Sequence, residues 1–259
     1  MNELSYWLLR NGNQLLTTID QSQGNIFPRG RASDFEIYKD ALLVGTWQGL
    51  PCYAAEFDKL PDSTSGVLMP VRSLFSLADA EAISLIGRAT QLLDWQKNHR
   101  YCGRCDELTT IKTGEFAMLC SACNLLAYPR ISPAVMVLIS RDDELLLARS
   151  HHFKPGVFSA LAGFVEAGET LEQCAVREVR EEVGIEMGIE ITNLRYFGSQ
   201  SWPFPDSLMV AFFADYADGI IKADQSEIEA AEWFLRSALP TLPEPLSIAR
   251  QLIEAANEK

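Results

Sequence analysis

The sequence predicts an α+β protein with a mixed sheet in its C-terminal half. Apolar strand-like runs and two helical stretches follow one another after residue 130 without a regular β-α-β alternation, which favours a mixed sheet. Two Cys-x-x-Cys pairs, typical of a zinc module, interrupt the chain before that half. We therefore expect three domains: a mainly β N-terminal domain at 1–98 that ends in a helix, a zinc ribbon at 99–127 and an α+β domain with the mixed sheet at 128–259.

Composition narrows the class of protein. The chain has 259 residues, of which 47% are hydrophobic and 22% charged, as in an ordinary globular protein with a sizeable core. A net charge of −13 argues against a broad nucleic-acid-binding surface, because such surfaces need clustered Lys and Arg. The first residues show no secretory signal pattern, and no apolar run is long enough to cross a bilayer, so we expect no membrane partner. Four of six cysteines in metal-type pairs indicate a reducing compartment, and we expect a cytoplasmic protein.

The N-terminal region reads as short strands joined by tight turns, followed by one helix. The stretches "RNGNQ" and "TWQGLP" each place turn residues between apolar runs, which predicts two hairpins. From Asp79 to His99 the apolar residues recur at spacings of three and four. Asp79 is a suitable N-cap for this helix.

The cysteine segment predicts one structural Zn²⁺ per chain. Cys102 and Cys105 form the first pair, and Cys120 and Cys123 form the second after fourteen intervening residues. Four thiolates complete a tetrahedral zinc shell, whereas a catalytic zinc keeps one position open. Redox chemistry would use one pair rather than two, and we do not count His99 as a ligand.

The stretch "GFVEAGETLEQCAVREVREEVGI", residues 163–185, predicts a capped amphipathic helix. Thr170 and Gln173 form a capping box, so the helix should begin at Leu171. Its apolar face recurs every fourth residue, and Gly184 should end it. The apolar face comprises Leu171, Ala175 and Val179.

Three carboxylates share another face of this helix. Glu178, Glu181 and Glu182 stand at positions i, i+3 and i+4, where they repel one another unless a cation lies between them. Oxygen ligands suit Mg²⁺ or Mn²⁺. Arg177 should orient these carboxylates by pairing, with Glu169 as one partner. The alternative interpretation of the three glutamates is a solvated acidic helix face. The simplest interpretation of Cys174 is a core position, and that of His151 and His152 is an exposed loop.

The whole stretch fits the pattern Gly-x5-Glu-x7-Arg-Glu-φ-x-Glu-Glu-x-Gly-φ, in which φ is apolar. On this pattern the chain resembles the Nudix hydrolases, which implies an α/β/α sandwich around a mixed sheet for residues 128–259. Downstream, "SQSWPFPDS" resembles the S-Q-P-W-P-F-P-x-S element of the NADH pyrophosphatases, with Ser201 where that family has proline. The same family has an N-terminal domain, a four-cysteine zinc ribbon and a Nudix domain in this order. The pattern is matched by Gly163, Glu169, Arg177, Glu178, Val179, Glu181, Glu182, Gly184 and Ile185.

The resemblance implies hydrolysis of NAD(H) to NMN(H) and AMP, removal of NAD caps from RNA 5′ ends, and a homodimer. It implies a catalytic set of Glu178, Glu181, Glu182 and Arg177, and Mg²⁺ or Mn²⁺ ligands at the three glutamates and Glu227. It leaves open which carboxylate accepts the proton of the attacking water. Tyr128 from the partner subunit and Phe164 would enclose the nicotinamide, although by themselves both residues also suit core packing. The implied substrate-binding residues are Arg72, Glu115, Tyr128, Ala162, Phe164, Gln200, Ser201, Trp202, Pro203, Phe204, Pro205, Asp206, Ser207 and Ala249.

Two other functions stay open at this point. One is a Nudix hydrolase of ADP-ribose or a dinucleoside polyphosphate, against which the "SQSWPFPDS" element argues. The other is a catalytically inactive regulator that binds nucleic acid through its ribbon, against which the complete glutamate set and the negative charge argue.

Overall fold

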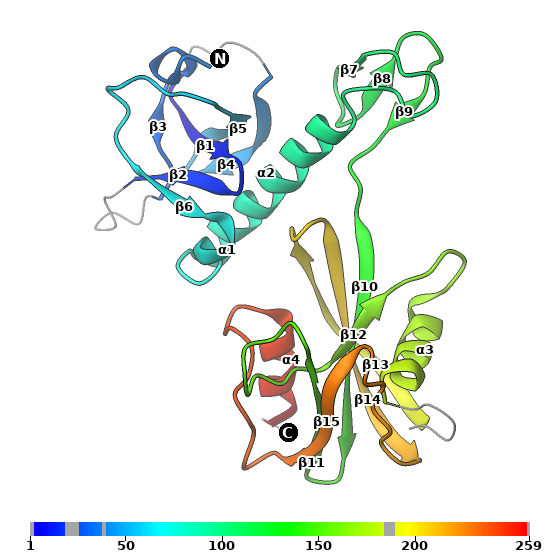
Figure 1. The fold of residues 1–259 in the computed structure, drawn as a ribbon. Coiled ribbons are helices and arrows are strands. Elements are labelled where there is room, and N and C mark those ends of the chain that lie inside the picture. Colours follow the sequence, from blue (N-terminus) through cyan, green and yellow to red (C-terminus); the bar gives the residue numbers. More distant parts are fainter. Residues whose placement is uncertain (1–2, 19–25, 38–39, 184–189, 258–259) are drawn as a thin grey trace. The chain divides into compact units, whose positions relative to one another are not determined.

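The computed structural model describes residues 3–18, 26–37, 40–183 and 190–257. The chain forms two compact units, residues 1–130 and 131–259, which we call the N-terminal and C-terminal units and describe separately (Figure 1). Gly184 and Ile185, two positions of the Nudix pattern, lie outside the described residues. Within those residues, no helix is long and apolar enough to cross a bilayer.

The N-terminal unit is built on a mainly antiparallel sheet. Its strand order is β4-β5-β1-β2-β6, with β3 paired to β1, and the β1–β5 pair is parallel. The two predicted hairpins are present as β1–β2 and β4–β5, and the second turns at Gln48 and Gly49, which both have positive φ as a tight hairpin turn requires. The strands are β1 (Ser5–Asn11), β2 (Gln14–Thr17), β3 (Arg29–Gly30), β4 (Leu42–Trp47), β5 (Leu50–Glu56) and β6 (Val67–Pro70).

A long helix closes this sheet. A 3₁₀ turn (Ala32–Phe35) and the short α1 (Val71–Leu74) precede α2 (Ala80–Asn98), which packs against β4 and β5. The predicted N-cap is confirmed, because Asp79 accepts a hydrogen bond from the Ala82 amide at 2.9 Å. The buried Arg10 on β1 pairs with Glu56 and with Asp94 of α2, at 2.7 Å each, and so ties the sheet to the helix.

The cysteine module follows α2 in the same unit. Its three short strands lie in the order β7-β8-β9 and are antiparallel. They bring the two halves of the cysteine segment face to face. The strands are β7 (Thr109–Ile111), β8 (Met118–Cys120) and β9 (Leu126–Ala127).

The C-terminal unit contains the predicted mixed sheet. Its strand order is β13-β14-β10-β11-β15, with β12 paired to β10. The central β10–β14 pair is parallel, and the other pairs are antiparallel. The strands are β10 (Ser132–Arg141), β11 (Glu144–Ser150), β12 (Leu161–Phe164), β13 (Glu190–Trp202), β14 (Ser207–Asp218) and β15 (Ile228–Leu235).

One helix covers each face of this sheet, so the predicted α/β/α sandwich is confirmed. On one face α3 (Leu171–Val183) buries Ala175 and Val179 with side chains of β10 and β14. On the other face α4 (Ile248–Asn257) packs Leu252 and Ile253 against the opposite side of the same strands. Alternate residues of β10 supply the two cores, because successive side chains of a strand point to opposite faces.

Candidate active site and zinc module

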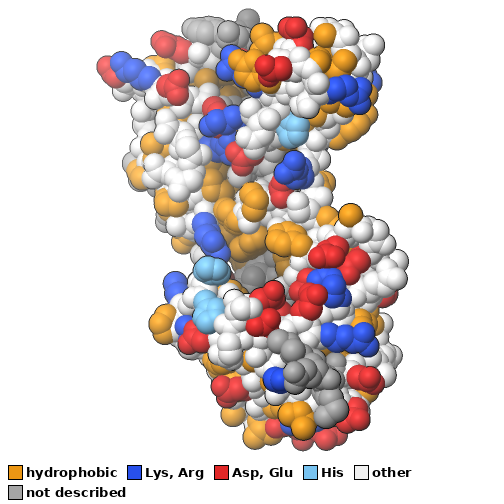
Figure 2. All heavy atoms as spheres, turned by 45° about the vertical axis from the view of Figure 1, so that its right-hand side comes forward, with side chains coloured by type: hydrophobic (Ala, Val, Ile, Leu, Met, Phe, Trp, Pro, Cys, Tyr) orange, Lys and Arg blue, Asp and Glu red, His pale blue; other side chains and the backbone are white. Residues whose placement is uncertain are grey.

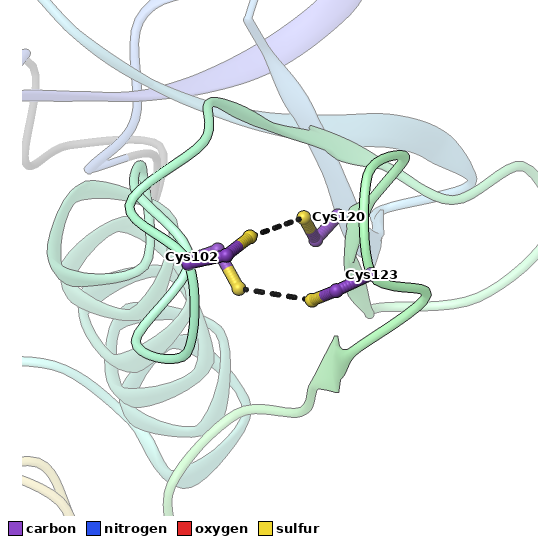
Figure 3. A group of neighbouring side chains, drawn as sticks. Cys102, Cys120 and Cys123 are labelled. Atoms are coloured by element: carbon purple, nitrogen blue, oxygen red, sulfur yellow. Dashed lines mark hydrogen bonds between the residues drawn. The ribbon is translucent and has the colours of Figure 1, made fainter.

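The four cysteines form one compact cluster. Their sulfur atoms all lie within 4.8 Å of one another, and the side chains turn toward a common centre (Figure 3). The Sγ atoms of Cys102 and Cys123, and those of Cys105 and Cys120, are 3.5 Å apart. Tetrahedral zinc with Zn–S bonds of about 2.3 Å needs sulfur atoms at such short separations, so the ligand set fits a structural zinc.

The two Cys-x-x-Cys turns have the same backbone design. In each turn the residue after the second cysteine has positive φ, 62° at Asp106 and 58° at Asn124. Its amide donates to the carbonyl of the first cysteine of that pair at 2.9 Å. Asp and Asn tolerate this left-handed conformation better than most residues. The amide of Arg104 also donates to Cys102 Sγ at 3.4 Å, and this bond is the main cause that lowers the pKa of the Cys102 thiol.

Helix α3 begins where the capping box predicts. The Gln173 amide donates to Thr170 Oγ1 at 3.2 Å, and the Thr170 amide donates to Gln173 Oε1 at 2.8 Å. These two bonds satisfy amides that the first turn leaves unpaired. The helix start therefore fixes where along the sheet the glutamates of α3 lie.

Arg177 is the centre of a carboxylate network. Its guanidinium donates two bonds to Glu169, at 2.6 and 2.8 Å, and one Nη1 bond of 2.8 Å to each of Glu178 and Glu181. It also donates to the carbonyl of Phe164 at 2.8 Å, which joins α3 to β12. The bonds from Arg177 are the main cause that lowers the pKa of Glu169 to about 2. The predicted pairing of Arg177 with Glu169 is present.

Gly163 leaves space for the carboxylate of Glu178. A Cβ at position 163 would lie 1.8 Å from Glu178 Cδ and 2.0 Å from each carboxylate oxygen. Glu178 is buried, and burial is the main cause that raises its pKa. The first glycine of the pattern is thus required by a close approach between β12 and α3, not by its own backbone angle.

Glu182 is a buried carboxylate with a strongly raised pKa. Burial is the main cause that raises its pKa to about 8, and the charges of Glu178 and Glu227 raise it further. The Ala162 amide donates to this carboxylate, but Oε2 is buried without a hydrogen-bond partner. A buried carboxylate oxygen without a hydrogen-bond partner, near the charges of Glu178 and Glu227, suits a ligand of a divalent cation, so this donor set fits such a cation.

Glu227 reaches this group from another part of the chain. It stands just before β15, and its charge raises the pKa of both Glu178 and Glu182.

On the face drawn in Figure 2, the described Lys and Arg side chains are scattered among Asp and Glu.

The stretch "SQSWPFPDS" forms the end of the β13–β14 hairpin. Trp202 pairs with Ser207 at the last rung, so residues 203–206 are the connecting loop. The rings of Trp202 and Phe204 pack edge to face with centroids 5.1 Å apart, and the Phe204–Pro205 peptide is cis. Asp206 fastens the loop to the start of β10: its Oδ1 accepts from Ser132 Oγ, and its carbonyl accepts from the Ser132 amide, both at 2.9 Å.

Gln200 holds the start of α4. Its Nε2 donates to the Leu246 carbonyl and its Oε1 accepts from the Ile248 amide, both at 2.8 Å. The resemblance implies a substrate-binding role for Gln200, which no contact in the structure tests. Its side-chain amide bonds to the backbone at the start of α4. These bonds join β13 to α4, on which Ala249 is buried.

The remaining predicted substrate residues are distributed over both units. Tyr128 and Phe164 are 54% and 57% exposed, so neither is a core residue of its own unit. Arg72 lies in α1, Glu115 pairs with Lys112 beside the cysteine module, and Ala162 lies on β12.

Sequence reasoning missed three supporting residues of the site. Ser132 bonds to Asp206 of the hairpin loop, and no local sequence pattern predicts a bond between residues 74 positions apart. Asp224 and Ser226 bond to each other just before Glu227. The tetrapeptide "DQSE" was a usable signal here, because Asp followed two residues later by Ser is typical of a turn closed by the Asp side chain.

Comparisons with known proteins identify relatives of this chain. Three family models match in sequence: the NADH pyrophosphatase-like rudimentary NUDIX domain over residues 4–95, the NADH pyrophosphatase zinc ribbon domain over 97–128 and the NUDIX domain over 130–255. A Nudix hydrolase structure from Nitrosomonas europaea has a TM-score of 0.45 and 23% identity, over 54% of this chain and 80% of its own.

Curated relatives match along almost the full length. The NAD-capped RNA hydrolase NudC of Pseudomonas aeruginosa LESB58 is 44% identical over 252 residues, 96% of this chain and 87% of the relative. The NAD-capped RNA hydrolase NudC of Stutzerimonas stutzeri A1501 is 45% identical over 240 residues, 91% of this chain and 84% of the relative. The fold and the glutamate helix define a Nudix hydrolase. Within that superfamily, the chain belongs to the NADH pyrophosphatase family.

Proposed function

We propose that this protein hydrolyses the pyrophosphate bond of NAD(H) to give NMN(H) and AMP, and that it removes NAD caps from RNA 5′ ends by the same cleavage. The observation that carries the proposal is the full-length similarity to NAD-capped RNA hydrolases, which spans all three modules. The "SQSWPFPDS" hairpin of this chain supports it further, because a dinucleotide needs a binding wall beyond the pyrophosphate.

In this proposal Glu178, Glu181, Glu182 and Glu227 hold Mg²⁺ or Mn²⁺. The bound cations supply charge neutralisation for the pyrophosphate and a water of lowered pKa. Arg177 keeps Glu178 and Glu181 oriented through its 2.8 Å bonds and is itself fixed by Glu169. Gly163 allows Glu178 to approach β12, and the Ala162 amide orients Glu182.

The substrate would extend from these carboxylates to the hairpin loop. Residues 203–206, fastened by Ser132, form a preset wall that loses little ordering entropy on binding. The exposed rings of Tyr128 and Phe164 are available to stack on the nicotinamide, Tyr128 coming from the partner subunit of a homodimer. We also propose a cytoplasmic location, in keeping with four reduced cysteines that bind zinc.

A substrate panel tests this proposal. Zinc-loaded protein would be assayed with NADH, NAD, ADP-ribose and NAD-capped RNA, in Mg²⁺ and in Mn²⁺. We expect NMN(H) and AMP from NAD(H), and a 5′-monophosphorylated RNA from the capped RNA. Preferential hydrolysis of ADP-ribose would identify another Nudix specificity, and no hydrolysis of any substrate would favour the inactive regulator.

A further inference from the structure

The segment that precedes Glu227 is held by backbone bonds to the end of α3. The Lys222 amide donates to the Val183 carbonyl at 3.0 Å, and the Asp224 amide donates to the Glu182 carbonyl at 2.9 Å. Both acceptors belong to the last turn of α3, whose carbonyls have no partner within the helix. The segment is therefore anchored directly beside Glu182.

Asp224 closes the turn between this anchor and β15. Its Oδ1 accepts from the Ser226 amide at 2.8 Å and from Ser226 Oγ at 2.7 Å. Its carbonyl accepts from the amides of Glu227 at 3.0 Å and Ile228 at 2.9 Å. Ile228 is buried in the core beneath α3, so the turn runs from one fixed point to another.

Glu227 itself is an exposed residue of that turn. Its turn begins at the bond between the Asp224 amide and the Glu182 carbonyl, so Glu227 lies three residues along the chain from a direct contact with the last turn of α3. An exposed glutamate on a short turn keeps one position beside the end of α3 only if its backbone is fixed. Asp224 makes the side-chain and main-chain bonds that fix it.

We propose that Asp224 is a positioning residue that holds Glu227 beside the last turn of α3 and thereby raises the affinity of the site for Mg²⁺ or Mn²⁺. The inference rests on the proposed function, in which Glu227 is a metal ligand. Residues that orient metal ligands commonly change metal affinity by about 10- to 100-fold when they are removed. The alternative is a turn that merely stabilises the fold.

Mn²⁺ binding to zinc-loaded protein, followed by electron paramagnetic resonance, tests the proposal without relying on turnover. We expect Asp224→Ala to weaken Mn²⁺ binding about tenfold. Asp224→Asn should stay within about twofold of the wild type, because its amide oxygen can accept the same two bonds from Ser226. The matched control is Asp218→Ala, which removes another carboxylate that accepts one local backbone bond, from Gly219 at 2.8 Å, and should leave binding unchanged.

Glu227→Gln separates the failure of this inference from the failure of the proposed function. If Glu227→Gln binds Mn²⁺ like the wild type, Glu227 is not a ligand and the proposed metal site is wrong. If Glu227→Gln weakens binding and Asp224→Ala does not, the metal site stands and the positioning role is overturned. Equal weakening by Asp224→Asn and Asp224→Ala would also overturn it, because charge rather than the turn would then set the affinity.

Discussion

The four cysteines of the ribbon and the glutamates around α3 are both anionic ligand sets, but the structure holds them in opposite ways. The cysteine sulfurs already lie within 4.8 Å of one another in a closed cluster. The glutamates have other partners instead of a common centre: Arg177 pairs with Glu178 and Glu181, while Glu182 is buried with one oxygen lacking a hydrogen-bond partner. The cysteine cluster is closed around one ion position. The glutamates belong to a part of the fold that stays intact without a bound cation.

This difference follows from where each set lies in the chain. The cysteines lie on two tight turns of a module with only three short strands, so the ion is a major part of what holds the ribbon together. The glutamates project from a helix and a turn that the sandwich core already supports. The two sites should therefore respond differently when a ligand is removed.

Loss of one zinc ligand should have the largest effect. We expect Cys102→Ser to reduce zinc from one per chain to near zero and to unfold the ribbon, because structural zinc contributes about 10 kcal/mol or more in small zinc modules. Metal analysis and limited proteolysis between residues 99 and 127 measure this. Cys52→Ser is the control, since it alters a buried cysteine outside the cluster and should keep full zinc content. A folded ribbon without zinc would refute the assignment.

Glu182→Gln should abolish most activity but stabilise the protein that lacks Mg²⁺ and Mn²⁺. We expect kcat to fall about 100-fold or more, the scale for losing one electrostatic contact at the reacting group.

The pKa of Glu182 is about 8 in the folded protein and 4.5 when unperturbed, so the stability from its proton is present below pH 4.5 and lost as the pH rises to about 8. Each pKa unit corresponds to about 1.4 kcal/mol.

The Gln variant lacks that pH dependence. At pH 8 without Mg²⁺ or Mn²⁺, its Tm should exceed that of the wild type by roughly 10 °C, and the difference should shrink toward pH 4.5. Saturating Mg²⁺ should reverse the order, because only the wild type gains the full binding energy. Thermal unfolding of zinc-loaded protein measures both. A Gln variant that is less stable at pH 8 without Mg²⁺ would mean that Glu182 has a structural role.

Gly163→Ala should lower kcat about tenfold. The added methyl group would occupy the position of the Glu178 carboxylate, which must then leave its place beside Arg177. A displacement near 1 Å at a reacting site can cost even more than this. The control is Gly198→Ala on β13, whose methyl group would meet only Ile248 Cδ1, at 3.9 Å. Steady-state kinetics in Mg²⁺ compare the two variants, and equal activity would contradict the tight approach.

The sequence was sufficient where a local pattern determines local geometry. The capping box at Thr170 fixes the start of α3, and the cysteine spacing fixes the ribbon turns. It was insufficient for bonds between distant segments. Gln200 bonds to the backbone at the start of α4, and Ser132 bonds to Asp206 in the hairpin loop. Both pairings arise only once the sheet has formed. The same holds for the burial of Glu182, which the acidic helix face alone does not reveal.

The hairpin loop offers the smallest and most selective test. Its bond from Ser132 Oγ to Asp206 Oδ1 contributes about 1 kcal/mol to the position of the loop. Removing it with Asp206→Ala should therefore raise KM for NADH about fivefold with kcat nearly unchanged. Ser132→Ala removes the same bond from the other side and should give the same increase, if the bond acts only by fixing the wall. A larger increase for Asp206→Ala than for Ser132→Ala would mean that Asp206 also contacts the substrate. A small pyrophosphate ester that does not reach the loop should be hydrolysed normally by both variants. If both variants lose activity equally on both substrates, the loop supports the core rather than the dinucleotide, and the proposed wall at residues 203–206 is wrong.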